Sequence, residues 1–289
     1  MNASLTVLVS GSTGNQGGAV VRALIAKGHK VRALTRNVTS PAAQQLVTLG
    51  AEVIQGDMDN AESIGQILKE VEVFYLMGNP MDVVEAEVKQ GIALADAANA
   101  ANISHLVYGS VANADLDTGI PHFDSKYKVE QHIKTLGLPY TISAPVFFMD
   151  NVVAPWSIDA LKGGKIVQAM PGDRLVQQVS VKNIGEFVAS LIDRRESVFG
   201  KRYDFAGDEL TGDESAKILS EITRHNIVFE SIPVSYVMEQ SEDMGLMFEW
   251  FDKVGYNVDL ESLHKEFSDM VWQDFNQWAE SQSWDFLSS

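Results

Sequence analysis

The chain has 289 residues, of which 45% are hydrophobic and 21% are charged. This composition excludes a disordered chain, a collagen-like repeat and a coiled coil. The absence of cysteine excludes a disulfide scaffold, a zinc–thiolate site, an iron–sulfur cluster and a cysteine nucleophile. We therefore expect a globular protein of the reducing cytoplasm.

The formal net charge is −17, and it is concentrated near the C-terminus. Residues 201–289 hold 6 Lys and Arg against 19 Asp and Glu. Such a surface repels nucleic acid and anionic membranes, so we expect neither as a partner. It is either a solvated acidic surface or a surface for a basic protein.

No run approaches the roughly 18–20 apolar residues of a membrane span, and the first ten residues predict a strand, not a signal peptide.

Predicted strands and helices alternate through the first half of the chain. The strands are expected at 5–10, 30–34, 51–55, 71–77, 105–108 and 140–144. The helices between them are expected at 18–27, 40–49, 61–68, 83–101 and 125–136, with Gly28 ending the first and Asp59 or Asn60 capping the third. This order predicts an α/β fold with a doubly wound parallel sheet, whose ligands bind at the carboxyl ends of the strands.

The alternation loosens after Pro145, where glycine and proline turns become frequent. Residues 179–192 are typical of a returning strand and helix. We therefore predict a Rossmann domain over residues 1–150 with a returning segment of about 179–195. Residues 151–178 and 196–289 are expected to form a smaller, partly helical C-terminal lobe.

A glycine loop joins the first strand to the first helix, with the spacing G-x-x-G-x-x-G at Gly11, Gly14 and Gly17. Glycines let the backbone turn tightly and approach a pyrophosphate, which the helix N-terminus then stabilises. The strand–turn–helix context favours a dinucleotide site. The alternative is a loop whose glycines serve only helix–strand packing.

The second strand ends at Arg36 and Asn37, where an NAD-specific site usually has an acidic residue. A guanidinium matches a phosphate, so the cofactor is predicted to be NADP(H), unless Arg36 is only a surface residue. Asp57 follows the third strand and can accept a hydrogen bond from the adenine amino group, or cap the next helix. The fourth strand ends at 77–79, at the edge where the middle of the cofactor is expected.

The sequence resembles the NmrA-like family of the atypical short-chain dehydrogenase/reductase superfamily. The matching stretches are VLVSGSTGNQGG (7–18), VRALTRN (31–37), GAEVIQGDMDN (50–60), EVKQGIALADAA (87–98), HFDSKYKVE (122–130) and PVFFMDN (145–151). Residues 276–286 are also similar to the last helix and tail of the family. The rest of the C-terminal third matches only vaguely.

The resemblance implies a Rossmann fold that binds NADP(H), with a role for each matching residue. The pyrophosphate residues would be Gly11, Ser12, Thr13, Gly14, Asn15, Gln16 and Gly17, and the residues of the adenosine half Arg36, Asn37, Asp57 and Met58. Met77, Gly78 and Asn79 would line the middle, Lys89 and Lys126 would contact phosphate or ribose, and Phe147, Phe148, Met149 and Asp150 would lie at the nicotinamide end.

The catalytic pattern of the superfamily is only partly present. Standard short-chain reductases use a serine followed by Tyr-x-x-x-Lys, in which the tyrosine is the proton donor. Here Ser110 and Lys126 are present, but His122 occupies the place of the tyrosine. His122 is either a replacement acid or a helix residue without a chemical role. Lys126 is either a proton donor or a clamp on the ribose.

Two functions follow from this partial pattern. The missing tyrosine favours a redox-responsive NADP(H) sensor that changes conformation or partners with the state of the cofactor. The retained lysine supports an NADPH-dependent reductase of a small carbonyl, quinone or dye-like substrate instead. The sequence predicts no metal site, because its histidines lack metal-ligand spacing. It leaves the substrate or regulatory protein partner, the enzymatic activity and the oligomeric state open.

Overall fold

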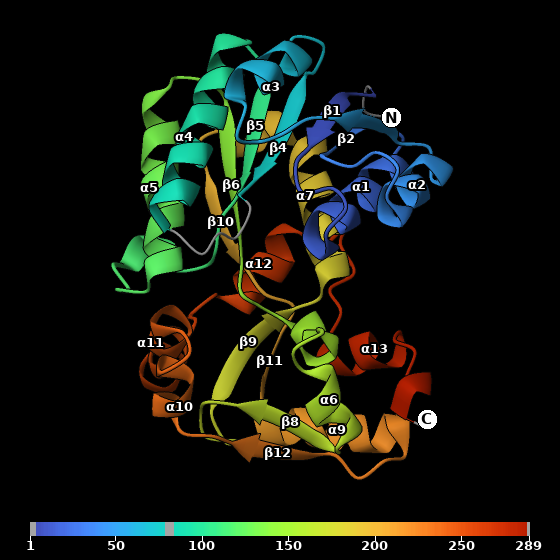
Figure 1. The fold of residues 1–289 in the computed structure, drawn as a ribbon, viewed down its shortest axis with the longest axis vertical. Helices are drawn as coiled ribbons and strands as arrows, with labels where there is room; N and C mark the ends of the chain where they lie inside the picture. The colour runs from blue at the N-terminus through green and yellow to red at the C-terminus, as the bar shows by residue number, and fades with distance from the viewer. Residues whose placement is uncertain (1–3, 79–83, 288–289) are drawn as a thin grey trace. The chain divides into compact units, whose positions relative to one another are not determined.

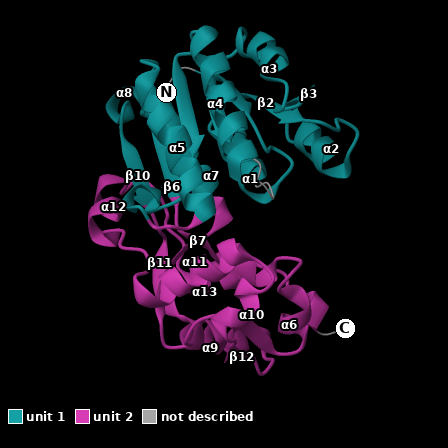
Figure 2. Ribbon diagram, turned by 60° about the vertical axis from the view of Figure 1, so that its left-hand side comes forward, with its two compact units in different colours: residues 1–117, 121–144, 184–204 teal, residues 118–120, 145–183, 205–289 magenta. Residues whose placement is uncertain are grey.

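The computed structural model describes residues 4–78 and 84–287. The chain divides into two compact units, coloured separately in Figure 2. The first comprises residues 1–117, 121–144 and 184–204, and the second residues 118–120, 145–183 and 205–289. The chain therefore leaves the first unit after Asp117 and again after Ala144, and it returns to that unit at Pro121 and at Ile184.

A seven-stranded sheet in the order β10-β6-β5-β4-β1-β2-β3 forms the centre of the first unit (Figure 1). Its strands are β1 (Thr6–Val9), β2 (Lys30–Thr35), β3 (Glu52–Gln55), β4 (Val73–Met77), β5 (His105–Gly109), β6 (Tyr140–Pro145) and β10 (Arg202–Phe205). Every neighbouring pair from β6 to β3 is parallel. The strand order reverses between β1 and β4, which is where open α/β sheets bind ligands. The predicted doubly wound fold is confirmed.

Helices cover both faces of this sheet. They are α1 (Asn15–Ala26), α2 (Pro41–Thr48), α3 (Ala61–Leu68), α4 (Val84–Ala100), α5 (Pro121–Thr135), α7 (Val181–Asp193) and α8 (Arg195–Val198), with a 3-10 turn at Ala114–Leu116. Leu8 belongs to the core that α3, α4 and α5 cover, whereas Val7 and Val9 belong to the core under α1 and α7. Successive residues of a strand point to opposite faces, so both faces of β1 are apolar and buried.

Local sequence signals set the ends of several helices. The Oγ of Ser40 accepts a hydrogen bond from Ala43 N at 3.2 Å and caps α2. The side chain of Asn60, not that of Asp59, caps α3 by accepting from Ser63 N at 3.0 Å. Gly28 follows α1 with a φ of +85°, the left-handed conformation that glycine adopts most readily.

Two helices begin earlier than the sequence predicts, and one strand of the sheet was not predicted. Helix α1 begins at Asn15 rather than Gly18, and α5 begins at Pro121 rather than Ser125. Proline fits the first helical position because its missing N–H would have no partner there. Strand β10 alternates between half-buried and buried residues, and it joins the sheet beside β6.

The second unit combines two small sheets with helices. Its elements are β7 (Phe147–Phe148), α6 (Ile158–Lys162), β8 (Lys165–Gln168), β9 (Leu175–Val179), β11 (Asp208–Thr211), α9 (Gly212–Thr223), β12 (Val228–Ser231), α10 (Val234–Met238), α11 (Glu242–Lys253), α12 (Leu260–Glu266) and α13 (Phe275–Glu280), with 3-10 turns at Met149–Val153 and Asp285–Leu287. Strand β9 pairs with β7 and β11. The expectation that the strand near Val179 returns to the central sheet is therefore wrong, although the helix after it, α7, is confirmed.

The described residues contain neither a helix suited to crossing a membrane nor a cluster of metal ligands. No helix among them combines the length and the apolar character that a bilayer requires. No three His, Asp or Glu side chains within residues 4–78 and 84–287 lie close enough together to hold a metal ion.

Candidate functional site

The glycine loop is a tight turn that leaves the N-terminus of α1 open. Gly11 has a φ of +59°, and its carbonyl accepts a hydrogen bond from Gly14 N at 3.0 Å. A Cβ on Gly17 would lie 2.3 Å from Gly11 O, which is too close for any side chain. No side chain caps α1, and its first turn has no acidic residue. The unused N–H groups of this helix end therefore form a site for an anion.

Two polar residues of the loop fasten it to the sheet. Ser12 Oγ donates to Leu34 O at 2.7 Å, and Gln16 Nε2 donates to the hydroxyl of Tyr75 at 2.9 Å. Burial raises the pKa of Tyr75, so its hydroxyl stays neutral. Ser12 and Gln16, which the resemblance assigns to the pyrophosphate, thus contact the protein and position the loop.

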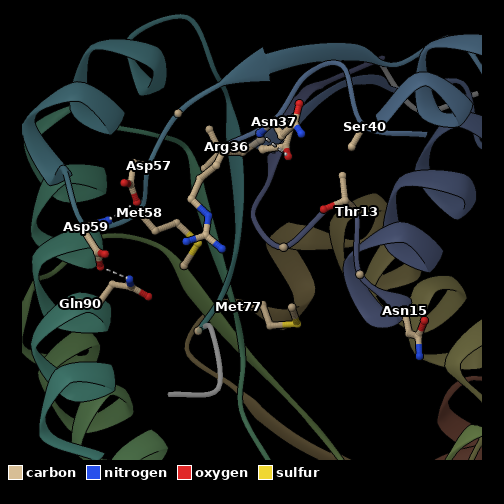
Figure 3. Close-up of a pocket in the computed structure, with 16 residues that line it drawn as sticks. Thr13, Asn15, Arg36, Asn37, Ser40, Asp57, Met58, Asp59, Met77 and Gln90 are labelled. Carbon is tan, nitrogen blue, oxygen red and sulfur yellow. Dashed lines mark hydrogen bonds between the residues drawn. The ribbon is translucent and has the colours of Figure 1, made fainter. Parts of the chain in front are cut away.

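A cavity of about 600 Å³ opens beside the glycine loop (Figure 3). The residues that follow β1, β2, β3 and β4 supply most of its wall. Its lining residues are Gly11, Thr13, Gly14, Asn15, Leu34, Thr35, Arg36, Asn37, Ser40, Gly56, Asp57, Met58, Asp59, Met77, Gly78 and Gln90. It lies at the carboxyl edge of the sheet, where the strand order predicts a ligand site.

Arg36 offers its guanidinium to this cavity. Its side chain is exposed and lies between Thr13 and Asp57 in Figure 3. It forms no hydrogen bond or ion pair with any residue of 4–78 or 84–287, whereas Arg32 in the preceding strand β2 binds Glu52 at 3.0 Å and Glu70 at 2.7 Å. Arg36 is therefore a cation that the described protein does not neutralise, at the position predicted for a 2′-phosphate contact.

The turn after β3 forms the opposite wall. Asp57 Oδ1 accepts a hydrogen bond from Asp59 N at 3.1 Å, and Asp59 Oδ1 accepts from Gln90 Nε2 at 2.6 Å. Asn37, near the end of β2, uses its Oδ1 to accept from Thr39 N at 3.0 Å. Asp57, Met58 and Asn37 all line the cavity, as the predicted cofactor contacts require.

Lys126 does not itself line the cavity, and its ammonium is ion-paired. Its ammonium donates to Oε1 of Glu87, whose other oxygen accepts from Ser125 Oγ at 2.9 Å. Glu87 is 4% exposed. A Cβ on Gly78 would lie 3.0 Å from Glu87 Oε1, so the pair adjoins the end of β4 where Gly78 lines the cavity.

Ser110 belongs to a second buried network. Its hydroxyl donates to Oε1 of Glu130, and Arg202 Nε donates to the other oxygen of Glu130 at 3.0 Å. Arg202 also binds Asp204, which accepts from Asn113 N at 3.2 Å. Burial raises the pKa of Asp204 to about 6, even though Arg202 favours its charged form.

The remaining predicted residues lie elsewhere. His122 is in the first turn of α5, with its ring edge-to-face on Phe123 at 4.8 Å between centroids, and it does not line the cavity. Lys89 is an exposed residue of α4 that does not line it either. Asn79 is outside the described residues. The last group belongs to the second unit: Phe147 and Phe148 in β7, Met149 in its core, and Asp150 accepting from Val181 N at 2.8 Å.

Sequence reasoning missed several residues of the site. Glu87, Gln90 and Glu130 are buried polar residues on helices, and their partners are 20 to 72 residues away in the chain. The available signal was a polar residue on the core face of a helix, since such residues are rarely buried without a partner. That signal identifies the residue but not its partner.

Comparison with known proteins agrees with this architecture. The sequence profile described as the NmrA-like family matches residues 3–281. A protein of Dictyostelium discoideum described as NmrA-like family domain-containing is 29% identical over 276 residues, which cover 88% of this chain and 90% of that protein.

Solved structures share the fold at lower sequence identity. Triphenylmethane reductase of Citrobacter sp., solved with NADP(H), has a TM-score of 0.81 at 22% identity and covers 97% of this chain and 99% of that one. The negative transcriptional regulator NmrA, solved with NADP, has a TM-score of 0.75 at 20% identity and covers 96% and 95%. At these identities the likeness shows the fold alone.

Proposed function

The chain belongs to the NmrA-like family, and from this premise we propose that the cavity of its first unit binds NADP(H). The observation that carries the proposal is Arg36, a cavity-lining guanidinium without a partner among residues 4–78 and 84–287. An NAD-specific site would have a carboxylate near this position to bind the 2′-hydroxyl. A guanidinium instead favours the 2′-phosphate that distinguishes NADP(H).

The residues present fit the other parts of this cofactor. The open N-terminus of α1 suits the pyrophosphate. Gly17 packs so closely on Gly11 that it has no room for a side chain, so no side chain at this position covers the backbone of the loop. Asp57 presents a carboxylate in the same wall as Arg36 and can accept from the adenine amino group. When bound, the cofactor supplies or takes up a hydride.

We propose that the chain uses this site chiefly as a sensor, changing conformation or partner with the redox state of the cofactor. The candidate proton donors support this choice. The ammonium of Lys126 is bound by Glu87, the hydroxyl of Ser110 is bound by Glu130, and a histidine replaces the tyrosine of the reductases. NmrA, which shares the fold, is a regulator.

The second candidate is an NADPH-dependent reductase of a small carbonyl, quinone or dye-like substrate. The observation in its favour is the place of Lys126, whose partner Glu87 lies against the cavity-lining Gly78. An ammonium released from this pair would be near the cavity. The reductase from Citrobacter that shares the fold acts on dyes.

Calorimetric titration of the purified chain with NADP⁺, NADPH, NAD⁺ and NADH tests the binding proposal. We expect both phosphorylated forms to bind at least about ten-fold more tightly than the others, because each charge-assisted hydrogen bond contributes about 1.5–3 kcal/mol. Equal affinity for all four, or no binding, would refute the proposal.

Hydrogen exchange and turnover then separate the two roles. The backbone amides of a sensor should exchange their hydrogens at different rates with NADP⁺ bound and with NADPH bound. A sensor should also oxidise NADPH no faster in the presence of quinones and aldehydes than in their absence. Lys126→Met is compared with Lys128→Met, an exposed residue of the same helix. Substrate-dependent turnover that only Lys126→Met abolishes, with NADPH affinity retained, would establish the reductase.

A further inference from the structure

Gln90 is a buried polar side chain of α4 that lines the cavity, and only one of the two polar atoms of its amide has a hydrogen-bond partner among the described residues. It is 8% exposed. Its Nε2 donates to Asp59 Oδ1 at 2.6 Å, but its Oε1 is buried without a hydrogen-bond partner among the described residues. Native proteins rarely leave such an atom unpaired, so an unpaired one beside a cavity points to a ligand.

The bond to Asp59 determines which end of the amide faces the ligand. An ionised carboxylate only accepts hydrogen bonds, so the NH₂ group of Gln90 must be the end that faces Asp59. In Figure 3 the amide oxygen points away from Asp59. The free end of Gln90 is therefore an acceptor, and it suits a ligand that brings an N–H or O–H donor.

The neighbours of Gln90 indicate which part of the ligand this is. Asp57, Met58 and Asp59 line the same wall, and Arg36 lies nearby in Figure 3. If Arg36 binds the 2′-phosphate, this end of the cavity holds the adenosine half of the cofactor. The 6-amino group supplies the N–H donors of the adenine ring, and it carries two of them.

On the basis of the proposed function, we infer that Gln90 is a specificity-determining residue, whose Oε1 accepts a hydrogen bond from the 6-amino group of adenine. Asp57 can accept the second N–H of the same amine. Asp59 is a positioning residue that holds the Gln90 amide in the accepting orientation. The site would then bind a 6-aminopurine in preference to a 6-oxopurine, because the 6-oxo group is a hydrogen-bond acceptor and would face another acceptor, Oε1 of Gln90.

Nicotinamide hypoxanthine dinucleotide phosphate tests this inference, because it differs from the natural cofactor in having the 6-oxo group. Calorimetry should show that the unmodified chain binds the adenine form at least about five-fold more tightly. Gln90→Met should lose most of this ratio, chiefly by weakening the adenine form. Gln131→Met, at an exposed residue of α5, should keep the full ratio.

Gln90→Ala provides a second test if the methionine does not fit, since alanine is smaller and favours helix. A loss of discrimination in either folded variant supports the inference. Equal binding of the two dinucleotides by the unmodified chain, or a full ratio in the Gln90 variants, would overturn it and leave the proposed function standing. Failure to bind either dinucleotide would instead refute the proposed function itself.

Discussion

Lys126 and Glu87 form an ion pair between α5 and α4, in which the carboxylate is almost fully buried. Ser125 Oγ donates to the same carboxylate at 2.9 Å, so both of its oxygens have a donor. The superfamily pattern leads one to expect Lys126 at a cofactor, yet in this structure its charge is compensated by its own protein. The pair therefore joins two helices and also controls whether the ammonium is available.

Replacing Lys126 should lower the free energy of unfolding more than replacing Glu87 does. Lys126→Met leaves the Glu87 carboxylate buried without its countercharge, which costs about 3–5 kcal/mol in comparable pairs. Glu87→Gln should cost less, because the Lys126 side chain is 18% exposed and its charge can reach water. Urea unfolding measures both, and a cost below about 0.5 kcal/mol for Lys126→Met would contradict the prediction.

Arg36→Ala should weaken NADP(H) binding about 10- to 100-fold and affect NAD(H) binding little, because the guanidinium is predicted to contact only the extra phosphate. Arg32→Ala is the matched control, since Arg32 lies in β2, which ends directly before Arg36, but is bound by Glu52 and Glu70. Calorimetry on both variants checks this. Equal losses for the two dinucleotides in Arg36→Ala would show that Arg36 does not recognise the phosphate.

Gly17→Ala should disrupt the glycine loop, because the new Cβ would lie 2.3 Å from Gly11 O. We expect a stability loss of about 1–3 kcal/mol, as for other overpacked sites, and loss of dinucleotide binding. Gly14→Ala is the control: its Cβ would lie 3.4 Å from the same oxygen, at an ordinary φ of −89°. Thermal melting and calorimetry should separate the two variants, and equal stability would argue against the predicted clash.

Asp204 should make stability depend on pH. Its pKa is about 6 in the folded chain, against about 3.9 for an unfolded aspartate, so the folded state holds this proton more tightly. The resulting stabilisation is complete below about pH 4 and is lost as the pH rises through 6. Between pH 5.5 and 7.5 the loss should be about 1 kcal/mol.

Asp204→Asn should lack this component, because the amide does not titrate. Urea unfolding at pH 5.5 and 7.5 compares it with the unmodified chain and with Asp159→Asn, an exposed residue of α6. Identical pH dependence in all three proteins would show that Asp204 does not titrate in this range.

The sequence by itself determined the alternation of strands and helices, the glycine loop and the place of Arg36. These features depend on residues that are close in the chain. Apolar strands followed by amphipathic helices give parallel crossovers, and parallel strands bring their carboxyl ends to one edge. The sequence alone therefore predicts that Gly11, Arg36 and Asp57 lie at one edge of the sheet, and all three line the cavity.

Only the tertiary structure decided which buried polar groups pair. Gln90 meets Asp59 across 31 residues, and Lys126 meets Glu87 across 39. Helical periodicity shows which face of α4 is buried, but the packing of α3, α4 and α5 on the sheet selects the partner. The addition of β10 beside β6 is likewise a long-range pairing, because the alternating residues of β10 favour a strand but do not select the strand that it joins.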